Sequence, residues 1–340
     1  HVAVIPSVTC AGDVASAIVR QVAGTVGCFH HQGCCQLPPD LERVTETLIS
    51  LGCSPNVGAA LIVSLGCEGT DTERLYDAIR ASGKPAAIIR IQELGGVSAA
   101  IKAGIDAAQE LVMEISGLAR EPVDISRVVM SIKCGASDTT SGMASNCVIG
   151  YVADKLVDLG AAVVFGETTE FLGGEHLLAQ RAVTPEVGQN ILNIVGRMEQ
   201  RARSMGCDMR KGQPTPGNIA GGLSSIEEKS LGAIVKSGTR PIQGVLDYHE
   251  RMGARKGLWI KDTPGREPEI LTGMAAAGAQ FMMFSTGRGA PQGFPTMPVL
   301  KVCGNPHTYQ RMEHDMDLNA GRIITGQASI EQVGEEAFAA

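Results

Sequence analysis

The chain has 340 residues, of which 44% are hydrophobic, 19% charged and 4% aromatic. This composition is typical of a globular protein, and the irregular spacing of its glycines and prolines excludes fibrous and low-complexity classes. A formal net charge of −7 without any run of Lys and Arg argues against nucleic acid or an anionic membrane as the main partner. No apolar run approaches the roughly 18 residues of a membrane span. Ten cysteines in so long a chain favour a reducing cytoplasm over a secreted disulfide framework.

Short apolar runs alternate with helical patterns through the first third of the chain. Strands are expected at residues 2–7, 25–30, 59–65 and 86–91, and helices at 13–23, 41–51, 72–81 and 97–115. This alternation predicts the α/β class with mostly parallel sheets. A linker at 117–124 then separates a first domain, 1–118, from a second, 125–340. We expect two Rossmann-like or flavodoxin-like lobes, with the active cleft at the carboxyl ends of the strands.

The second domain starts with the same pattern and then becomes less regular. Strands are expected at 127–133, 161–165, 257–261, 280–285 and 299–303, and helices at 142–159, 185–204, 226–237 and 243–251. The segments 206–222 and 287–298 are rich in glycine and proline. Loops of this length in a compact domain are usually functional or mobile.

Sulfur-bearing and polar side chains follow several of these strands. They are His30 and Cys34, then Cys67 and Glu68, then Cys134, Ser137 and Asp138. Imidazole and thiolate groups are suited to iron, zinc or manganese. Cys34, Cys67 and Cys134 are also compatible with a three-thiolate iron–sulfur site. The alternative is that these cysteines are small side chains packed beneath turns.

A denser cluster of titratable groups follows the strand at 161–165. Glu167, Glu170, Glu175 and His176 lie within ten residues and combine hard metal ligands with acid–base groups. A solvated acidic loop is the alternative. His176 is the predicted base because imidazole titrates near neutral pH. Its own alternative is a histidine at a helix start that is bonded to a neighbouring carboxylate.

Two later loops also follow strands. Asp262 comes after 257–261, and Thr286–Gly289 come after 280–285. Glycines there let backbone amides approach an anion, and Arg288 can bind a carboxylate through two parallel hydrogen bonds. The next glycine, Gly293, is one residue too far for the dinucleotide fingerprint, and no helical pattern follows. The chain also lacks a P-loop, a Gly-x-Ser-x-Gly elbow and a zinc-protease helix, which argues against nucleotide hydrolysis and serine-type acyl transfer.

Distinctive stretches recur along the second domain. They are Lys133–Asp138, Gly166–Glu170, Gly174–Leu178, Ala182–Gly188, Pro214–Asn218, Gly221–Gly232, Asp262–Gly265, Ser285–Gly289 and Asp315–Asn319. In order and spacing they closely resemble the large catalytic region of the galactarate/altronate dehydratase family of sugar-acid lyases. The first domain resembles the same family in two motifs, His30-x-x-Gly-Cys34 and Leu65–Glu68. The resemblance therefore covers nearly the whole chain.

The resemblance implies a lyase that depends on a divalent metal, usually Fe²⁺ or Mn²⁺, and dehydrates a hexarate or hexonate to a 2-keto-3-deoxy acid. Some relatives in the family release sulfite from sulfolactate, often as two-subunit enzymes. Family members also carry a small β-rich domain or subunit before this region, and we expect that partner to be missing here. Assembly as a homo-oligomer stays open. A non-catalytic, two-lobed solute-binding protein is the remaining alternative.

Roles follow from what such a dehydration requires. A base removes a weakly acidic α-proton, and a metal on the substrate carboxylate stabilises the enediolate that develops. We expect three ligands from a pool of five and open positions for a small anionic hydroxy acid. The pool is His30, Cys67, Glu68, Asp138 and Glu170; the catalytic candidates are His176, Glu175, Asp262 and Lys229; the substrate-binding candidates are Arg288, Lys301, Ser137 and Thr286. For the lysines, a position on the solvated surface is the alternative.

Two departures from the family pattern concern the identity of the substrate. Ala136 stands where these dehydratases commonly have the second glycine of Cys-Gly-Gly-Ser-Asp, and it adds a methyl group at a tight turn. The segment 293–298 also differs from the altronate enzymes.

Overall fold

The first lobe is built from four β/α units. A computed structural model describes all residues from 1 to 340. The lobe contains β1 (Val2–Pro6), α1 (Gly12–Val19), β2 (Thr25–Gly27), α2 (Pro38–Gly52), β3 (Ala59–Ser64), α3 (Thr72–Ala81), β4 (Ala86–Arg90) and α4 (Val97–Ile115). Its sheet has the order β2-β1-β3-β4, with every pair parallel. The central strands β1 and β3 are buried along their whole length, which is why they appear in the sequence as unbroken apolar runs.

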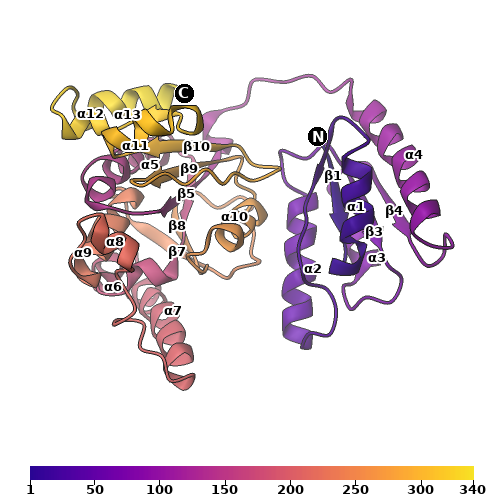
Figure 1. Ribbon diagram of the computed structural model, residues 1–340, viewed down its shortest axis with the longest axis horizontal. Helices are drawn as coiled ribbons and strands as arrows, with labels where there is room; N and C mark the ends of the chain where they lie inside the picture. The colour runs from indigo at the N-terminus through magenta and orange to yellow at the C-terminus, as the bar shows by residue number, and fades with distance from the viewer.

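The second lobe is larger and carries a seven-stranded sheet. Its elements are β5 (Val129–Gly135), α5 (Asn146–Asp158), β6 (Ala162–Phe165), α6 (Glu175–Gln180), α7 (Pro185–Ser204), α8 (Pro216–Ala220), α9 (Ile226–Ile234), β7 (Ile242–Leu246), β8 (Gly257–Lys261), α10 (Glu267–Ala276), β9 (Phe281–Thr286), β10 (Val299–Cys303), α11 (Pro306–Arg311), β11 (Leu318–Asn319), α12 (Gly321–Ile324) and α13 (Ile330–Ala339). The strand order is β11-β10-β9-β5-β6-β8-β7, again entirely parallel. The predicted α/β class with two parallel-sheet lobes is confirmed (Figure 1). No helix is both long and apolar enough to cross a membrane.

The helix predicted at 243–251 is wrong. Residues Ile242–Leu246 form β7, an edge strand that pairs with β8. Ile242, Gly244 and Leu246 are buried and alternate with less buried neighbours, which is the two-residue period of a strand. The helix α10, by contrast, lies in a segment for which no helix was predicted. Most of its residues are buried, so it shows little of the amphipathic pattern on which such a prediction depends.

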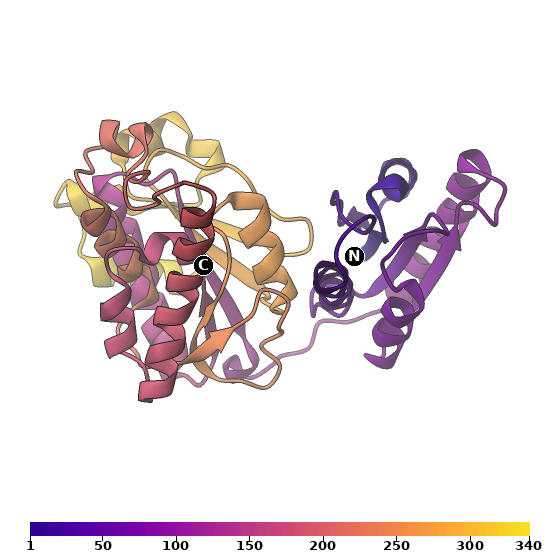
Figure 2. The same ribbon diagram turned by 90° about the horizontal axis from the view of Figure 1, so that it is seen from below.

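The two lobes are joined by an exposed segment and also pack against each other. Residues 118–124 carry no regular structure, and this linker passes between the lobes in the view of Figure 2. Across the interface α2 lies against α10, and Leu48 of α2 belongs to the same apolar core as Ile270 of α10. The side-chain amide of Asn56 donates to the carbonyls of Gln280, at 2.7 Å, and Thr296, at 2.9 Å. These contacts fix the position of the first lobe relative to the second.

The substitution Asn56→Ala tests this interface. It removes both interlobe hydrogen bonds, and we expect the free energy of unfolding to fall by about 1–3 kcal/mol. Urea denaturation followed by circular dichroism measures the change. Asn193→Ala is the matched control, because Asn193 is exposed on α7 and accepts only from Gln189, a pair worth at most about 0.5 kcal/mol. Equal stabilities of the two variants would show that Asn56 contributes nothing across the interface.

Candidate functional site

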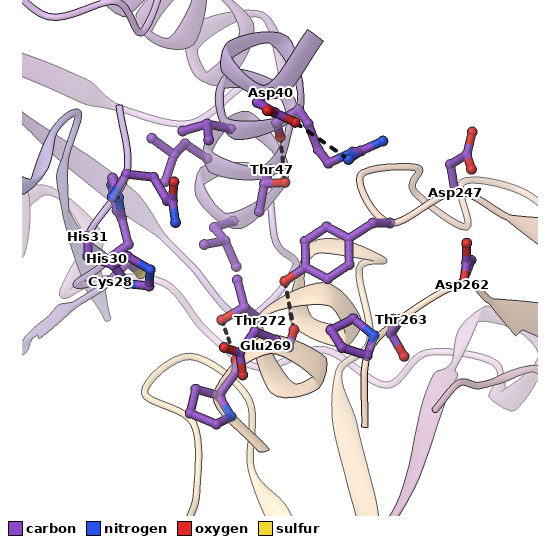
Figure 3. A pocket seen from close by; sticks show the side chains of 18 of the residues that line it. Cys28, His30, His31, Asp40, Thr47, Asp247, Asp262, Thr263, Glu269 and Thr272 are labelled. Atoms are coloured by element: carbon purple, nitrogen blue, oxygen red, sulfur yellow. Dashed lines mark hydrogen bonds and ion pairs between the residues drawn. The ribbon is translucent and has the colours of Figure 1, made fainter. Parts of the chain in front are cut away.

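A cavity of about 1020 Å³ lies between the lobes. The first lobe contributes the residues that follow β2, among them Cys28, His30 and His31, together with α2. The second lobe contributes α7, α10 and the residues that follow β6, β7 and β8. Figure 3 shows Asp247 after β7, Asp262 and Thr263 after β8, and Glu269 and Thr272 on α10. Its volume is at the upper end of the usual range for small-molecule sites, about 300–1,000 Å³. The cavity therefore lies at the carboxyl ends of strands from both sheets.

Asp262 is the predicted catalytic residue that lines this cavity. One carboxylate oxygen accepts from the Thr168 hydroxyl at 2.6 Å, and the other accepts from Arg197 at 2.5 Å. The guanidinium of Arg197 also lies 3.9 Å from Asp247. Arg43 and Arg201 complete a set of three arginines around the cavity. Charges of both signs thus face this space, and Asp262 is already paired.

His30 lines the same cavity, but both of its ring nitrogens are engaged. Nε2 lies 2.7 Å from the Pro6 carbonyl, and Nδ1 accepts the backbone N–H of Gln32 at 3.1 Å. Together these bonds require a neutral ring that carries its proton on Nε2. Burial lowers the pKa of His30 and favours that neutral form. No ring nitrogen remains for a metal ion in this arrangement.

Glu68 and Cys67 lie at the carboxyl edge of the first sheet. Glu68 accepts from the Ser7 hydroxyl at 2.5 Å and from the Gly66 N–H at 2.7 Å, so it ties the end of β1 to the loop after β3. Cys67 is exposed, as are three further cysteines of this edge, Cys10, Cys34 and Cys35. The hydrogen bond to Cys35 raises the pKa of Cys34, and the nearby thiols of Cys10 and Cys67 add to the effect.

Asp138 links several loops at the carboxyl edge of the second sheet. Its Oδ1 accepts from the hydroxyl of Thr140 at 2.6 Å and from the N–H of Ser141 at 3.0 Å. Its Oδ2 accepts from Asn305, which follows β10, at 3.0 Å. The side chain is buried, and a Cβ at Gly287 would lie 2.0 Å from Oδ1. This carboxylate therefore joins the loops after β5, β9 and β10.

Glu170 and Lys229 form a nearly buried ion pair. Lys229 Nζ donates to Glu170 Oε1 at 3.1 Å and lies 3.0 Å from Oε2, without a hydrogen bond to Oε2. Lys229 also donates to the side-chain carbonyl of Gln213. Oε2 is thus a buried carboxylate oxygen that makes no hydrogen bond, although the ammonium compensates its charge. A buried acceptor that makes no hydrogen bond needs an explanation, and a catalytic role is one such explanation.

The position of Lys229 depends on a close approach of two backbones. On α9, Gly232 faces Gly142 of the π-helical turn Ser141–Ser145. A Cβ at Gly142 would lie 3.1 Å from the Gly232 Cα, and one at Gly232 would lie 3.3 Å from the Gly142 Cα. Only a pair of glycines fits at this distance without displacing backbone.

Beneath this edge lies a fully buried group of charges, Lys133, Glu167 and Lys236. Glu167 accepts from Lys236 at 2.5 Å and from the Cys134 N–H at 2.9 Å, and Lys133 lies 3.3 Å away. Burial opposes ionisation of Glu167, but the charges of Lys236 and Lys133 lower its pKa overall. Sequence reasoning placed Glu167 in a cluster of metal-ligating and acid–base groups and assigned no role to Lys133 or Lys236. Lys133 inside an apolar strand was the available signal.

The remaining catalytic candidates on α6 lie apart from the cavity. His176 is exposed and makes no hydrogen bond. Glu175 accepts from Arg210 at 2.7 Å and from the Gly173 N–H at 2.6 Å. Neither residue lines the space between the lobes.

Three of the substrate-binding candidates lie at the ends of β5 and β9. Arg288 is exposed; its N–H donates to the Ala136 carbonyl at 3.0 Å, and its guanidinium donates to Gly217. Ser137 accepts from Asn218 at 2.9 Å through its carbonyl. The hydroxyl of Thr286 accepts the N–H of Gly289 at 3.0 Å.

Lys301, the fourth of these candidates, lies within β10. It is buried with its Nζ 3.8 Å from the centre of the Phe284 ring, and burial lowers its pKa to about 8.

The residues present do not fit a metal ion. No three His, Cys, Asp or Glu side chains are close enough together to hold one. His30, Cys67 and Glu68 belong to the first lobe, whereas Asp138 and Glu170 belong to the second. Cys134 is buried in β5 and is not grouped with Cys34 and Cys67 as an iron–sulfur site requires. The five ligands and Fe²⁺ or Mn²⁺ stay predictions.

Comparisons with known proteins identify both lobes. A family model described as D-galactarate/Altronate dehydratase, C-terminal, matches residues 125–340, and one described as D-galactarate dehydratase/Altronate hydrolase, second domain, matches residues 1–116. The (2R)-sulfolactate sulfo-lyase subunit beta of Chromohalobacter salexigens is 38% identical over 99% of this chain and 86% of its own. Altronate dehydratase of Bacillus subtilis is 32% identical over 98% of this chain and 68% of its own. For galactarate dehydratase (L-threo-forming) of Escherichia coli these values are 35%, 86% and 57%.

Glu167→Gln tests the buried charge group. The variant leaves the Lys236 ammonium buried without a carboxylate and Lys133 with only its second partner, Glu267, at 3.3 Å, and we expect it to lose about 3–5 kcal/mol of unfolding free energy at neutral pH. Because the pKa of Glu167 is lowered in the folded state, its contribution is present above the ordinary carboxyl pKa and is lost as the pH falls through the lowered value. The variant should therefore show a weaker loss of stability on acidification. Glu110→Gln, at an exposed position of α4, is the control. Equal losses in the two variants would contradict the assignment.

Proposed function

Because this chain is a lyase of the D-galactarate/altronate dehydratase family, we propose that it removes water from a sugar acid of the hexarate or hexonate type. Two relatives named as dehydratases, of altronate and of galactarate, support this substrate class. The cavity between the lobes is large enough for an acid of six carbons; Thr169, the neighbour of Glu170, lines it, whereas Glu170, Lys229 and Arg288 do not.

The proposed reaction is an elimination next to a carboxylate. A base takes the proton from the α-carbon, and the electrons of that C–H bond form a C=C bond. The C–O bond at the β-carbon breaks, and the leaving hydroxide takes up a proton and departs as water. The resulting enol tautomerises to the 2-keto-3-deoxy acid. A well-placed base contributes about 10²–10⁴-fold to such a rate.

The ion pair of Glu170 and Lys229 is the observation on which the assignment of the base rests. Glu170 Oε2 is buried, has no hydrogen-bond donor and lies 3.0 Å from an ammonium group. We assign proton removal to this oxygen. Lys229 then faces the negative charge that moves onto the substrate carboxylate as the proton leaves. In a site largely closed to water, such a fixed cation stabilises developing charge far better than it does in bulk solvent.

The substrate carboxylate has a natural position in this sheet. β5 pairs with β6 on one side and β9 on the other, and parallel sheets bind ligands where the strand order changes direction. Ser137 follows β5, while Thr286 and Arg288 lie at the end of β9. The guanidinium of Arg288 is exposed and can add a carboxylate to its present bond with Gly217. We therefore assign Arg288 to substrate binding.

Release of sulfite from sulfolactate is the second candidate. The relative with 38% identity is named as a sulfo-lyase subunit, which favours this reaction over other eliminations. The same base and cation serve both reactions, since only the group that leaves the β-carbon differs. The name subunit beta also supports the proposal that this chain works with another polypeptide. A non-catalytic solute-binding protein is set aside, because the family consists of lyases.

Three substitutions test the assignment of the base. Glu170→Gln keeps the shape of the side chain but cannot take a proton, and we expect kcat to fall about 10²–10⁴-fold. Lys229→Met should lower turnover as well, whereas His176→Gln should leave it close to that of the unmodified chain. Steady-state kinetics with added Fe²⁺ or Mn²⁺ measure all three, and circular dichroism verifies folding. An inactive His176→Gln beside an active Glu170→Gln would return the role to His176.

The leaving group is tested by product analysis. We expect galactarate or altronate to yield a 2-keto acid and no sulfite. The keto acid is measured as its semicarbazone and sulfite with a thiol-reactive dye, in the same reactions. Sulfite released from sulfolactate, with no product from the sugar acids, would establish the second candidate instead. No product from any of these acids, with a copurifying partner polypeptide retained, would contradict both.

A further inference from the structure

Two adjacent thiols stand at the carboxyl edge of the first sheet. The Sγ atoms of Cys34 and Cys35 are 3.5 Å apart, and both residues are exposed. They follow β2, while Cys10 follows β1 and Cys67 follows β3, so each of three neighbouring strands is followed by an exposed thiol. The reaction proposed above uses none of these sulfur atoms.

The loop that carries the pair is held in one conformation. The Thr9 N–H donates to the Gln32 carbonyl, and the Gly69 N–H donates to the Gly33 carbonyl, both at 2.9 Å. The Gly33 N–H donates to the Gln36 side chain at 2.8 Å. Gly33 has a φ of +101°, and a Cβ there would lie 2.5 Å from the Ser7 carbonyl oxygen. The thiols are therefore presented side by side by a constrained turn rather than by a flexible segment.

The backbone at Cys35 is also unusual. Its φ of 55° lies in the left-handed region, which non-glycine residues other than Asn and Asp seldom adopt. Residues in such conformations persist where the surrounding structure enforces them, and they concentrate at functional sites. Here the enforced conformation places the Cys35 sulfur next to that of Cys34.

From this geometry we propose that Cys34 and Cys35 form a reversible disulfide, a redox-sensitive modification site at the rim of the cavity. The two S–H bonds break and one S–S bond forms, with the loss of two electrons and two protons. A peroxide accepts them and becomes two molecules of water. Alternatively, a small-molecule disulfide accepts them and becomes two thiols through a mixed-disulfide intermediate.

The bond requires the two sulfur atoms to approach each other and the local backbone to adjust. The sulfur atoms must approach from 3.5 Å to about 2.05 Å. Neighbouring Cα atoms are roughly 3.8 Å apart, below the usual range of about 4.4–6.8 Å for disulfides, so the bond is strained. Strained, exposed disulfides are easily reduced and belong to the labile, regulatory kind.

Oxidation of Cys34 and Cys35 affects the cavity because the loop that carries them also forms part of the cavity wall. The same turn supplies His30, His31, Gln32 and Gln36 to the cavity wall. A bond between Cys34 and Cys35 changes the backbone between Gly33 and Gln36 and hence the Gln36 side chain, which bonds to Gln32. This consequence for turnover rests on the proposed function, whereas the disulfide itself does not.

The test is carried out on the full chain with hydrogen peroxide at mildly alkaline pH. Tryptic cleavage after Arg20 and Arg43 yields one peptide that contains Cys28, Cys34 and Cys35. We expect this peptide to lose two hydrogen atoms and to resist fragmentation between residues 34 and 35. The reduced protein should bind phenylarsine oxide, which bridges two close thiols with release of water, and the oxidised protein should not.

Matched variants locate the bond. Cys34→Ser and Cys35→Ser should abolish both the mass change and arsenical binding. Cys28→Ser, in the same peptide but buried, and Cys207→Ser, exposed in the other lobe, should retain both. Sulfinic acids without a disulfide, or a bond from Cys34 to Cys10 or Cys67, would overturn the proposal.

Turnover is measured on the same samples. Oxidation should lower it, dithiothreitol should restore it, and the Cys35→Ser variant should not respond. A disulfide found by mass in a preparation without any turnover leaves the modification site standing and counts against the proposed function alone. Unchanged turnover in an active, oxidised enzyme would contradict the link to the cavity.

Discussion

The charge group of Glu167, Lys133 and Lys236 is the constraint on which the edge of the second sheet depends. Lys133 belongs to β5, Glu167 follows β6, and Lys236 lies in the turn after α9, so three separate segments meet at one carboxylate. All three side chains are buried, so loss of the Glu167 carboxylate would leave Lys236 without a carboxylate partner in a low dielectric and Lys133 with Glu267 alone. The group therefore forces the segments into a single relative position. Glu170 lies three residues after Glu167, and Lys229 lies on the helix just before Lys236. The charge group therefore also positions the two segments that carry the pair assigned to proton removal.

The division into two lobes serves a different purpose. Each sheet presents its strand ends to a common space, and the packing of α2 against α10 sets the width of that space. Asn56 adds directional bonds at one edge of the interface. Apolar packing alone would tolerate some sliding of the helices, whereas hydrogen bonds to two carbonyls define one register. The interface thus fixes the width of the cavity, although the cavity walls come from segments far apart in the chain.

The elements that sequence reasoning found are those whose burial leaves a regular pattern. β1 and β3 were found as unbroken apolar runs, whereas β7 was mistaken for a helix because its sequence, Ile-Gln-Gly-Val-Leu, lacks the alternation of apolar and polar residues that its burial shows. The functional side chains were expected at one edge of each sheet because the strands of a parallel sheet all end at the same edge.

Spacing along the chain, however, does not reveal which polar groups are already satisfied. His30, Glu68 and Asp138 have residue types suited to metal ligands, yet in the folded chain each binds its own neighbours. Only three-dimensional packing separates such structural ties from Glu170, which retains an unsatisfied oxygen.

The contact between Gly142 and Gly232 gives residues without side chains an indirect part in the chemistry. A methyl group at either position would require a shift between α9 and the turn Ser141–Ser145, and Lys229 lies on the helix that would shift. The absence of side chains at these two glycines thereby affects the distance between Lys229 and the proposed base, although neither glycine takes part in the reaction. We therefore expect Gly142 and Gly232 to tolerate substitution poorly, although glycine carries no functional group.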